Sequence, residues 1–355
     1  MAREDFSPAV REALAKRAGH RCSFPDCDQT TVGPSDEGTT AVSHTGMACH
    51  IFAASDGPAA RRVASKSDPE FLRSFENGIW TCYTHGKLID TDEATYTPEL
   101  LAFWRHLAEW RAKIRQRHGL DVQIPAAVEE GKSLPATKAL LSIENEASKL
   151  HEAFHDSCLG HIWDRDLVHM VREFAAELTL NSLTHGSATT VSVSIEWDRV
   201  VIRDNGRSFS PFELLSAPNG RGGKASAAPL LNDRLGEVVV AHLFENGENR
   251  TTIGFLRRTD HVKDFTHCFV EIQNERFKGE GFAEAAIFCQ NHLECEVVYV
   301  LANYLTYTNV RHLEEHLGTL PTGQKIVLLG GVMSKSLSDY LMGKIPGLVI
   351  GKIQH

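Results

Sequence analysis

Four residues near the start of the chain have the types and spacing of metal ligands. Cys22 and Cys27 flank the segment Ser-Phe-Pro-Asp, and Cys82 and His85 form a second close pair 55 residues after Cys27. Three thiolates and one imidazole can surround an ion tetrahedrally, which is the arrangement that structural Zn²⁺ prefers. The alternative is that these are packed cysteines beside an unrelated histidine. The spacing favours a structural zinc site.

A second set of polar residues lies near the middle of the chain. Glu177, Asn181 and His185 are spaced by four residues, so a helix over 167–184 would carry them on one side. A β-branched run then ends in Asp204-Asn205-Gly206. After it comes Gly220-Arg-Gly-Gly223, which permits close approach of the backbone to phosphate. The alternative for the helix is an ordinary solvated stripe. The ordered set predicts a nucleotide pocket.

Further residues that could take part in catalysis lie between and after the two ligand pairs of the first set. Between the two ligand pairs lie Cys49-His50-Ile and Asn77, and Lys87-Leu-Ile-Asp90 follows them. This order resembles the HNH endonucleases, whose ββα-metal fold would cover about residues 15–112. The resemblance implies that His50 is the general base that activates water and that Asn77 orients the histidine loop. A divalent cation would steady the scissile phosphate.

Two departures from the HNH pattern weaken the case for cleavage. Active relatives usually have a histidine that binds the catalytic metal where this chain has Gly86, and often an aspartate where it has Cys49. His44 or Asp90 could substitute. The basic pair Arg61-Arg62 favours contact with phosphates. The alternative is a degenerate zinc finger that docks DNA or a protein partner.

The second set resembles the GHKL ATPase superfamily, which includes gyrase, the Hsp90 chaperones, MutL and histidine kinases, over about residues 140–258. The resemblance implies that Asn181 holds Mg²⁺ and, through it, the phosphates of ATP. Asp204 would accept the adenine amino group, and Glu177 would polarise the attacking water. An ionised carboxylate only accepts hydrogen bonds, and Mg²⁺ binds few protein oxygens beside phosphate oxygens, so the chemistry agrees.

The glycines of this region have their own implied roles. Gly206 would allow close contact with the base, and the lid over the phosphates would contain Gly220, Gly222 and Gly223. Ser208 stands where the family commonly has a second glycine, and the lid is short. We therefore expect ATP binding and leave hydrolysis open.

Composition predicts an α+β multidomain protein. The 355 residues, 42% of them hydrophobic, are enough for several packed cores. Patterning predicts an HNH-like domain over 1–118, a linker over 119–135 and a GHKL-type α/β sandwich over 136–258. A small α/β unit of unknown role would cover 259–355. Four strand-like runs alternate with helical stretches in this last part.

Charge, apolar segments and cysteine usage indicate which partners and which cellular compartment to expect. The net charge of −9 gives no support for nonspecific coating of nucleic acid. The chain shows neither a long apolar span nor an apolar signal core, so we expect a cytoplasmic protein without a membrane partner. In that reducing compartment, Cys158, Cys268, Cys289 and Cys295 are predicted to be buried thiols.

The leading hypothesis is an ATP-regulated, metal-dependent nuclease acting on DNA, a combination typical of anti-phage defence. Its cofactors would be Zn²⁺, Mg²⁺ and ATP. The GHKL resemblance also implies that the protein forms a homodimer. The alternative is a nucleotide-sensing binding or signalling protein with a degenerate finger. A protein kinase of the anti-sigma-factor type would leave the finger unexplained.

Overall fold

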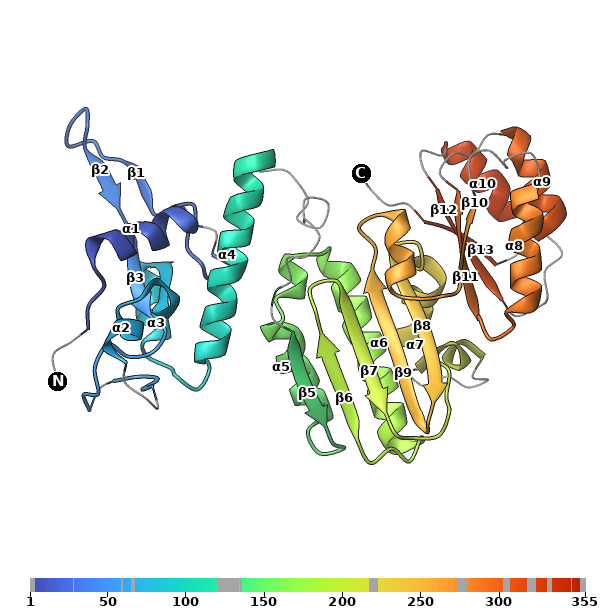
Figure 1. Cartoon of the computed structure of the whole chain (residues 1–355), viewed down its shortest axis with the longest axis horizontal. Helices are drawn as coiled ribbons and strands as arrows, with labels where there is room; N and C mark the ends of the chain where they lie inside the picture. The colour runs from blue at the N-terminus through green and yellow to red at the C-terminus, as the bar shows by residue number, and fades with distance from the viewer. Residues whose placement is uncertain are drawn as a thin grey trace. The chain divides into compact units, whose positions relative to one another are not determined.

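The chain forms two compact units, Met1–Pro135 and Ala136–His355, in a computed structural model. The structure describes residues 4–27, 29–58, 60–64, 68–119, 134, 136–216, 223–272, 280–302, 307–317, 324–330, 334–345 and 347–351. Almost all of the predicted linker over 119–135 therefore lies outside the described residues. Each unit is considered by itself (Figure 1).

The first unit is built on a two-stranded antiparallel sheet. Strand β3 (Gly46–His50) pairs with β4 (Gly78–Cys82), and α3 (Tyr83–Ile89) follows β4 directly. Three helices and a second antiparallel pair complete the unit: α1 (Pro8–Arg17), α2 (Pro69–Leu72), α4 (Pro98–His118), β1 (Val32–Pro34) and β2 (Val42–His44).

Local sequence signals explain where the two longer helices begin. Ser7 and Thr97 each accept a hydrogen bond at a helix N-terminus, from the backbone N–H groups of Val10 and Leu100, and a proline follows each of them. Helix α4 buries apolar residues at helical spacing, with Leu101, Trp104 and Leu107 at most 3% exposed. This face forms a large part of the core of the small unit.

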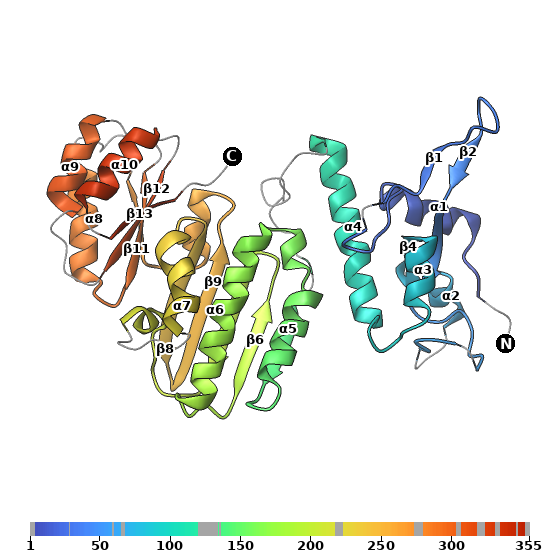
Figure 2. The same ribbon diagram turned by 180° about the vertical axis from the view of Figure 1, so that it is seen from behind.

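The second unit contains a five-stranded antiparallel sheet in the order β5-β6-β7-β9-β8. Helices α5, α6 and α7 cover one face of it (Figures 1 and 2). The bounds are β5 Thr137–Leu141, β6 Val191–Ile195, β7 Arg199–Asp204, β8 Val238–Glu245, β9 Glu248–Phe255, α5 Glu146–Asp156, α6 Arg165–Thr184 and α7 Gly223–Ala228. The predicted helix over 167–184 corresponds to α6.

A four-stranded parallel sheet completes the second unit, with its strands in chain order. The four strand-like runs predicted for this part correspond to β10 (Phe269–Ile272), β11 (Val297–Ala302), β12 (Lys325–Gly330) and β13 (Leu348–Gly351). Helices α8 (Glu280–Asn291), α9 (Tyr307–Leu317) and α10 (Lys335–Lys344) lie over one face (Figure 2).

Two hydrophobic cores meet at β11. Its alternate residues Val298 and Val300 belong to the core under α8–α10, whereas Val297, Tyr299 and Leu301 belong to the core of the five-stranded sheet. The Tyr299 hydroxyl also accepts a hydrogen bond from the Val240 N–H of β8, at 3.1 Å. The predicted boundary between residues 258 and 259 therefore falls inside one compact unit.

The cysteine prediction was wrong for one pair. Cys268 and Cys295 are joined by a disulfide, whereas Cys158 and Cys289 are buried free thiols as expected. The two half-cystines are 27 residues apart in the chain, and the parallel pairing of β10 with β11 brings them together. Among the described residues, no helix is both long and apolar enough to span a bilayer.

Candidate functional site

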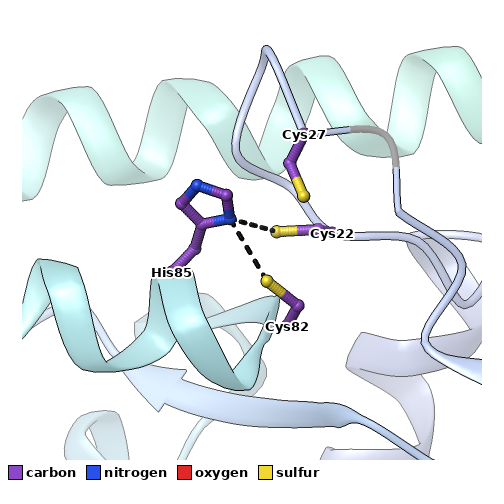
Figure 3. A group of neighbouring side chains, drawn as sticks. All are labelled: Cys22, Cys27, Cys82 and His85. Carbon is purple, nitrogen blue, oxygen red and sulfur yellow. Dashed lines mark hydrogen bonds between the residues drawn. The ribbon is translucent and has the colours of Figure 1, made fainter.

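Cys22, Cys27, Cys82 and His85 converge in the first unit, and we call them the Cys3His cluster (Figure 3). Their ligand atoms all lie within 4.8 Å of one another. The Nδ1 atom of His85 is 3.2 Å from the Cys82 sulfur and 3.6 Å from the Cys22 sulfur. Four such donors fit a tetrahedral zinc ion. The cluster could thus hold a metal ion such as zinc.

Each pair of the cluster comes from a local element. Cys22 and Cys27 lie on the turn after α1, and Cys82 ends β4 one residue before α3, whose first turn carries His85. The ring of Phe24 stacks on His85 with centroids 4.0 Å apart, and Trp104 of α4 meets Phe24 edge-on. These aromatic rings fix the imidazole beside the sulfurs.

Burial sets the protonation of the cluster. Burial raises the pKa of the Cys22 and Cys27 thiols. Hydrogen bonds from backbone N–H groups oppose this shift: Cys82 and Phe24 donate to Cys22, and Gln29 donates to Cys27. Burial lowers the pKa of His85, which keeps the imidazole neutral and able to bind a cation. Thiolates in such surroundings need a bound cation to balance their charge.

His50, the predicted general base, ends β3 away from the Cys3His cluster. Its ring stacks on Phe6 with centroids 3.8 Å apart, and its Nε2 lies 3.0 Å from the carbonyl oxygen of Glu4. Because a carbonyl only accepts, Nε2 carries a proton, and in the neutral imidazole Nδ1 has the lone pair. His50 also lines an open cavity of about 620 Å³.

That cavity has a mixed lining, and we call it the α1 groove. Basic and aromatic side chains predominate, from α1 and the residues beside it and from β2, β3, β4 and α3: Arg11, Lys16, His20, His44, His50, Phe6, Trp80 and Tyr83. Asp5 and Glu12 add two carboxylates, and Glu12 lies 2.6 Å from the Lys16 ammonium. Aromatic and cationic side chains together suit a polyanion with stacked bases.

Asn77 is fully buried behind His50 and makes three side-chain hydrogen bonds. Its Nδ2 donates to the carbonyl oxygens of Phe52 and Leu72 at 3.0 and 3.1 Å, and its Oδ1 accepts from the Phe52 N–H at 2.7 Å. These bonds fix the backbone two residues after His50. Asn77 thus holds the loop that follows His50, and its HNH role stays a prediction.

The positions that would bind a catalytic metal are packed instead. Cys49 is 4% exposed, its sulfur lies 3.3 Å from the Thr81 hydroxyl, and burial raises its pKa to about 12. A Cβ atom placed on Gly86 would lie 2.9 Å from that sulfur and 2.6 Å from the sulfur of Met47. Helix α3 can approach the sheet this closely because residue 86 has no side chain.

Replacing Gly86 with His, the residue usual at this position of the HNH pattern, is expected to destabilise the protein by about 3 kcal/mol, because a buried contact would be overpacked. The urea midpoint of unfolding measures the change. Gly33→His is the matched control in the same unit, since nothing lies within 4 Å of its Cβ position. Equal midpoints for the two variants would contradict the packing argument.

The predicted phosphate-binding role of Arg62 was wrong. Its side chain is 3% exposed, and its guanidinium donates to the carbonyl oxygens of Ile51 and Ile89 at 2.7 and 2.6 Å. It also lies 3.4 Å from the carboxylate of Asp90. Arg62 therefore holds the loop after β3 against the end of α3, and Asp90, a candidate replacement ligand, is its ion-pair partner.

Of the polar stripe predicted in the middle of the chain, Glu177 and Asn181 lie on α6 and His185 directly follows it, and Asn181 and His185 line a cavity. The Asn181 amide donates to the Glu177 carboxylate at 2.9 Å, which leaves the amide oxygen of Asn181 available for Mg²⁺. The cavity, here named the α6 pocket, measures about 230 Å³. Its lining consists of Asn181, Ser182, His185, Gly186, Arg207, Phe209, Glu213 and Leu214.

Asp204 is 8% exposed at the end of β7, and both of its carboxylate oxygens accept hydrogen bonds. Oδ1 accepts from the Gly206 N–H and the Asn249 amide, each at 2.9 Å, and Oδ2 accepts from the Ser182 hydroxyl at 3.0 Å. A carboxylate has about four acceptor positions, so Oδ2 can accept one more donor such as an exocyclic amine.

Asn249 was missed by the sequence analysis. From β9 its amide donates to Asp204 and to the carbonyl oxygen of Arg207, each at 2.9 Å, and its oxygen accepts from the Phe209 N–H at 3.2 Å. Asn249 therefore fastens the whole turn after β7. Asn249 stands among other polar residues at the start of β9 and belongs to no motif, so the sequence carried no signal for it.

The glycines of the second unit have tight surroundings. A Cβ on Gly206 would lie 2.8 Å from the carbonyl oxygen of Gly186, and one on Gly223 would lie 2.9 Å from the Glu177 carboxylate. The turn after β7 and the start of α7 therefore both approach α6 and its end closely. Gly220 and Gly222, predicted for the lid, lie outside the described residues.

One contact joins the rim of the α6 pocket to the parallel sheet. The hydroxyl of Ser210 donates to the carboxylate of Glu296, which precedes β11, and the Ser210 N–H donates to the pocket residue Glu213 at 2.9 Å. Burial raises the pKa of Glu296, the Ser210 hydrogen bond opposes this, and the charge of Glu213 adds to it.

Replacing Glu296 with Gln is expected to flatten part of the pH dependence of stability. A carboxyl whose pKa is raised on folding stabilises the protein at low pH, and this contribution is lost as pH rises through the folded value. The wild type should therefore lose stability relative to Glu296→Gln as pH rises above the ordinary glutamate range. Thermal melts across that range measure it, and parallel melting curves would contradict it.

Comparisons with known proteins do not assign the chain to a family. No protein-family model matches the chain, and no curated protein is detectably similar to it.

Proposed function

We propose that this protein binds ATP with Mg²⁺ in the α6 pocket and docks nucleic acid through its first unit. The observation that carries the proposal is the buried Asp204 carboxylate, which three internal donors hold with one acceptor position left over. Such an acceptor selects an adenine amino group over the carbonyl oxygen of guanine.

The α6 pocket supplies the other parts that ATP needs. Mg²⁺ would bind the amide oxygen of Asn181 and the phosphates, and Glu177 is held beside Asn181 by a hydrogen bond. His185 and Arg207 line the pocket and can face phosphate oxygens. When bound, Mg²⁺ would screen the phosphate charges. Hydrolysis, a homodimer and an anti-phage role stay predictions.

The α1 groove is the part of the first unit that suits nucleic acid. Arg11 and Lys16 offer cations to phosphates, while Trp80 and Tyr83 offer faces on which bases can stack. Docking is favoured over metal-dependent cleavage because Cys49 and Gly86 are packed against each other, where active relatives have ligands.

Binding of a labelled single-stranded DNA across a salt series, with and without ATP and Mg²⁺, tests this proposal. Lys16→Glu should weaken binding and reduce the salt dependence by about one counterion. Lys87→Glu, on the exposed side of α3 and outside the groove, is the matched control. Equal losses in the two variants, or no binding by the wild type, would refute docking in this groove.

A second candidate is the nuclease, and the geometry of His50 favours it. Its Nε2 donates to a backbone carbonyl, which keeps the lone pair on Nδ1 as a general base requires, and its ring lines the groove. Plasmid cleavage with Mg²⁺ or Mn²⁺, with and without ATP, tests it. Cutting that disappears in His50→Ala would support a nuclease, and intact plasmid under every condition would leave only docking.

A further inference from the structure

Residues of types that can bind metal ions, a histidine and a glutamate, lie beside the disulfide of the second unit. Cys268 immediately precedes β10 and Cys295 lies two residues before β11, so both sulfurs are at the same edge of the parallel sheet. The Tyr299 N–H donates to the carbonyl oxygen of Cys268 at 3.0 Å, which locks the two segments together. The sulfurs are thus held in place by the sheet as well as by their own bond.

His267 adds a third donor. Its Nε2 is 3.7 Å from the Cys268 sulfur, and the ligand atoms of His267, Cys268 and Cys295 lie within 4.8 Å of one another. The His267 side chain is 64% exposed, so ions can reach it from solvent. A carboxylate oxygen of Glu294 is 4.0 Å from this imidazole and is itself bonded to His292 at 2.8 Å.

We propose that Cys268, Cys295 and His267 form a second metal site, closed while the disulfide is intact and opened by its reduction. The ligand would be a thiophilic divalent cation such as Zn²⁺. Sulfurs bonded to each other carry no charge, whereas two thiolates and an imidazole bind zinc strongly. Glu294 or a water molecule completes the tetrahedron.

The chemistry balances with a dithiol as the reductant. The dithiol transfers two electrons and two protons to the disulfide, which becomes two thiols, while the dithiol closes to its own disulfide. Binding of Zn²⁺ then displaces the two thiol protons to solvent. A disulfide such as the oxidised dithiol reverses both steps: it accepts the two electrons, is itself reduced to the dithiol, and the ion is expelled. The proposal depends neither on nucleotide binding nor on nucleic acid.

The test measures metal content in the full-length protein. The protein is reduced with a phosphine, which does not compete as a thiol, desalted without oxygen, equilibrated with Zn²⁺ and desalted again. The reduced wild type should retain about one more ion per chain than the oxidised protein. Co²⁺ in place of Zn²⁺ should add thiolate charge-transfer absorption on reduction only.

Variants make the test specific. Cys268→Ser should show no gain on reduction, and His267→Ala should bind the added ion at least about tenfold more weakly. Cys289→Ser, a buried free thiol of the same unit, should keep the full gain. If Cys268→Ser fails to fold, the exposed His267→Ala carries the comparison alone. Equal metal content in oxidised and reduced wild type would overturn the proposal.

Discussion

Replacing Cys22 with Ser is expected to strip the metal from the first unit and unfold it, while residues 136–355 stay folded. Structural Zn²⁺ contributes on the order of 10–16 kcal/mol to the folding of small zinc-binding peptides, about as much as the whole stability of a typical domain. A small unit whose core consists of short helices, a short hairpin and one face of α4 has no comparable reserve. Zinc content together with limited proteolysis measures the outcome.

The control for this variant is Cys49→Ser, since Cys49 is a buried free thiol in the same unit but outside the Cys3His cluster. It should retain the metal and resist protease, because it loses packing and no ligand. A Cys22→Ser protein that keeps its full zinc content would show that the cluster is not a metal site. It would also remove the basis for comparison with the HNH fold.

Replacing Asp204 with Asn should weaken ATP binding at least about 100-fold, or about 2.7 kcal/mol. The new amide has only one oxygen, so its N–H₂ group faces either the donors Gly206 and Asn249 or the side on which Oδ2 accepts from Ser182 and would accept the adenine amine. If Asp204 binds adenine as proposed, the acceptor that it would offer the amino group is also weakened. Calorimetry with ATP and Mg²⁺ measures the affinity.

Two controls separate this effect from general damage. Asp198→Asn changes a carboxylate of the same unit that pairs with Arg199 at 3.0 Å, and it should leave ATP affinity unchanged. GTP should bind the wild type weakly and gain nothing from the substitution at Asp198. Wild-type affinity in Asp204→Asn would mean that the base is held elsewhere and that the GHKL comparison fails at its central residue.

The features that the sequence predicted well are local ones. Two close ligand pairs and a four-residue polar repeat each depend on a single turn or helix, so their geometry follows from spacing alone. The joining of the two ligand pairs needed a long-range contact between the Cys22–Cys27 segment and β4, where the Ser23 N–H donates to the carbonyl oxygen of Trp80 at 2.9 Å. Spacing along the chain does not predict that contact.

The features that were missed depend on tertiary packing. Arg62 looked like a surface cation, but its burial follows from carbonyl oxygens of His50, Ile51 and Ile89 that the fold collects around it. Asn249 meets Asp204 only because β9 pairs with β7. The Cys268–Cys295 pair likewise depends on adjacent parallel strands. No spacing rule predicts contacts of this kind.

The position of β11 between two hydrophobic cores limits how this part of the protein can evolve. All six of its residues are buried, and they alternate between the two interiors. Any side chain substituted in β11 must pack into one of the two cores. The sequences of the two sheets therefore cannot change independently of each other. Residues 259–355 could not be gained or discarded as a cassette without uncovering the apolar side of β8. We therefore expect descendants of this gene to transmit residues 136–355 as one heritable piece.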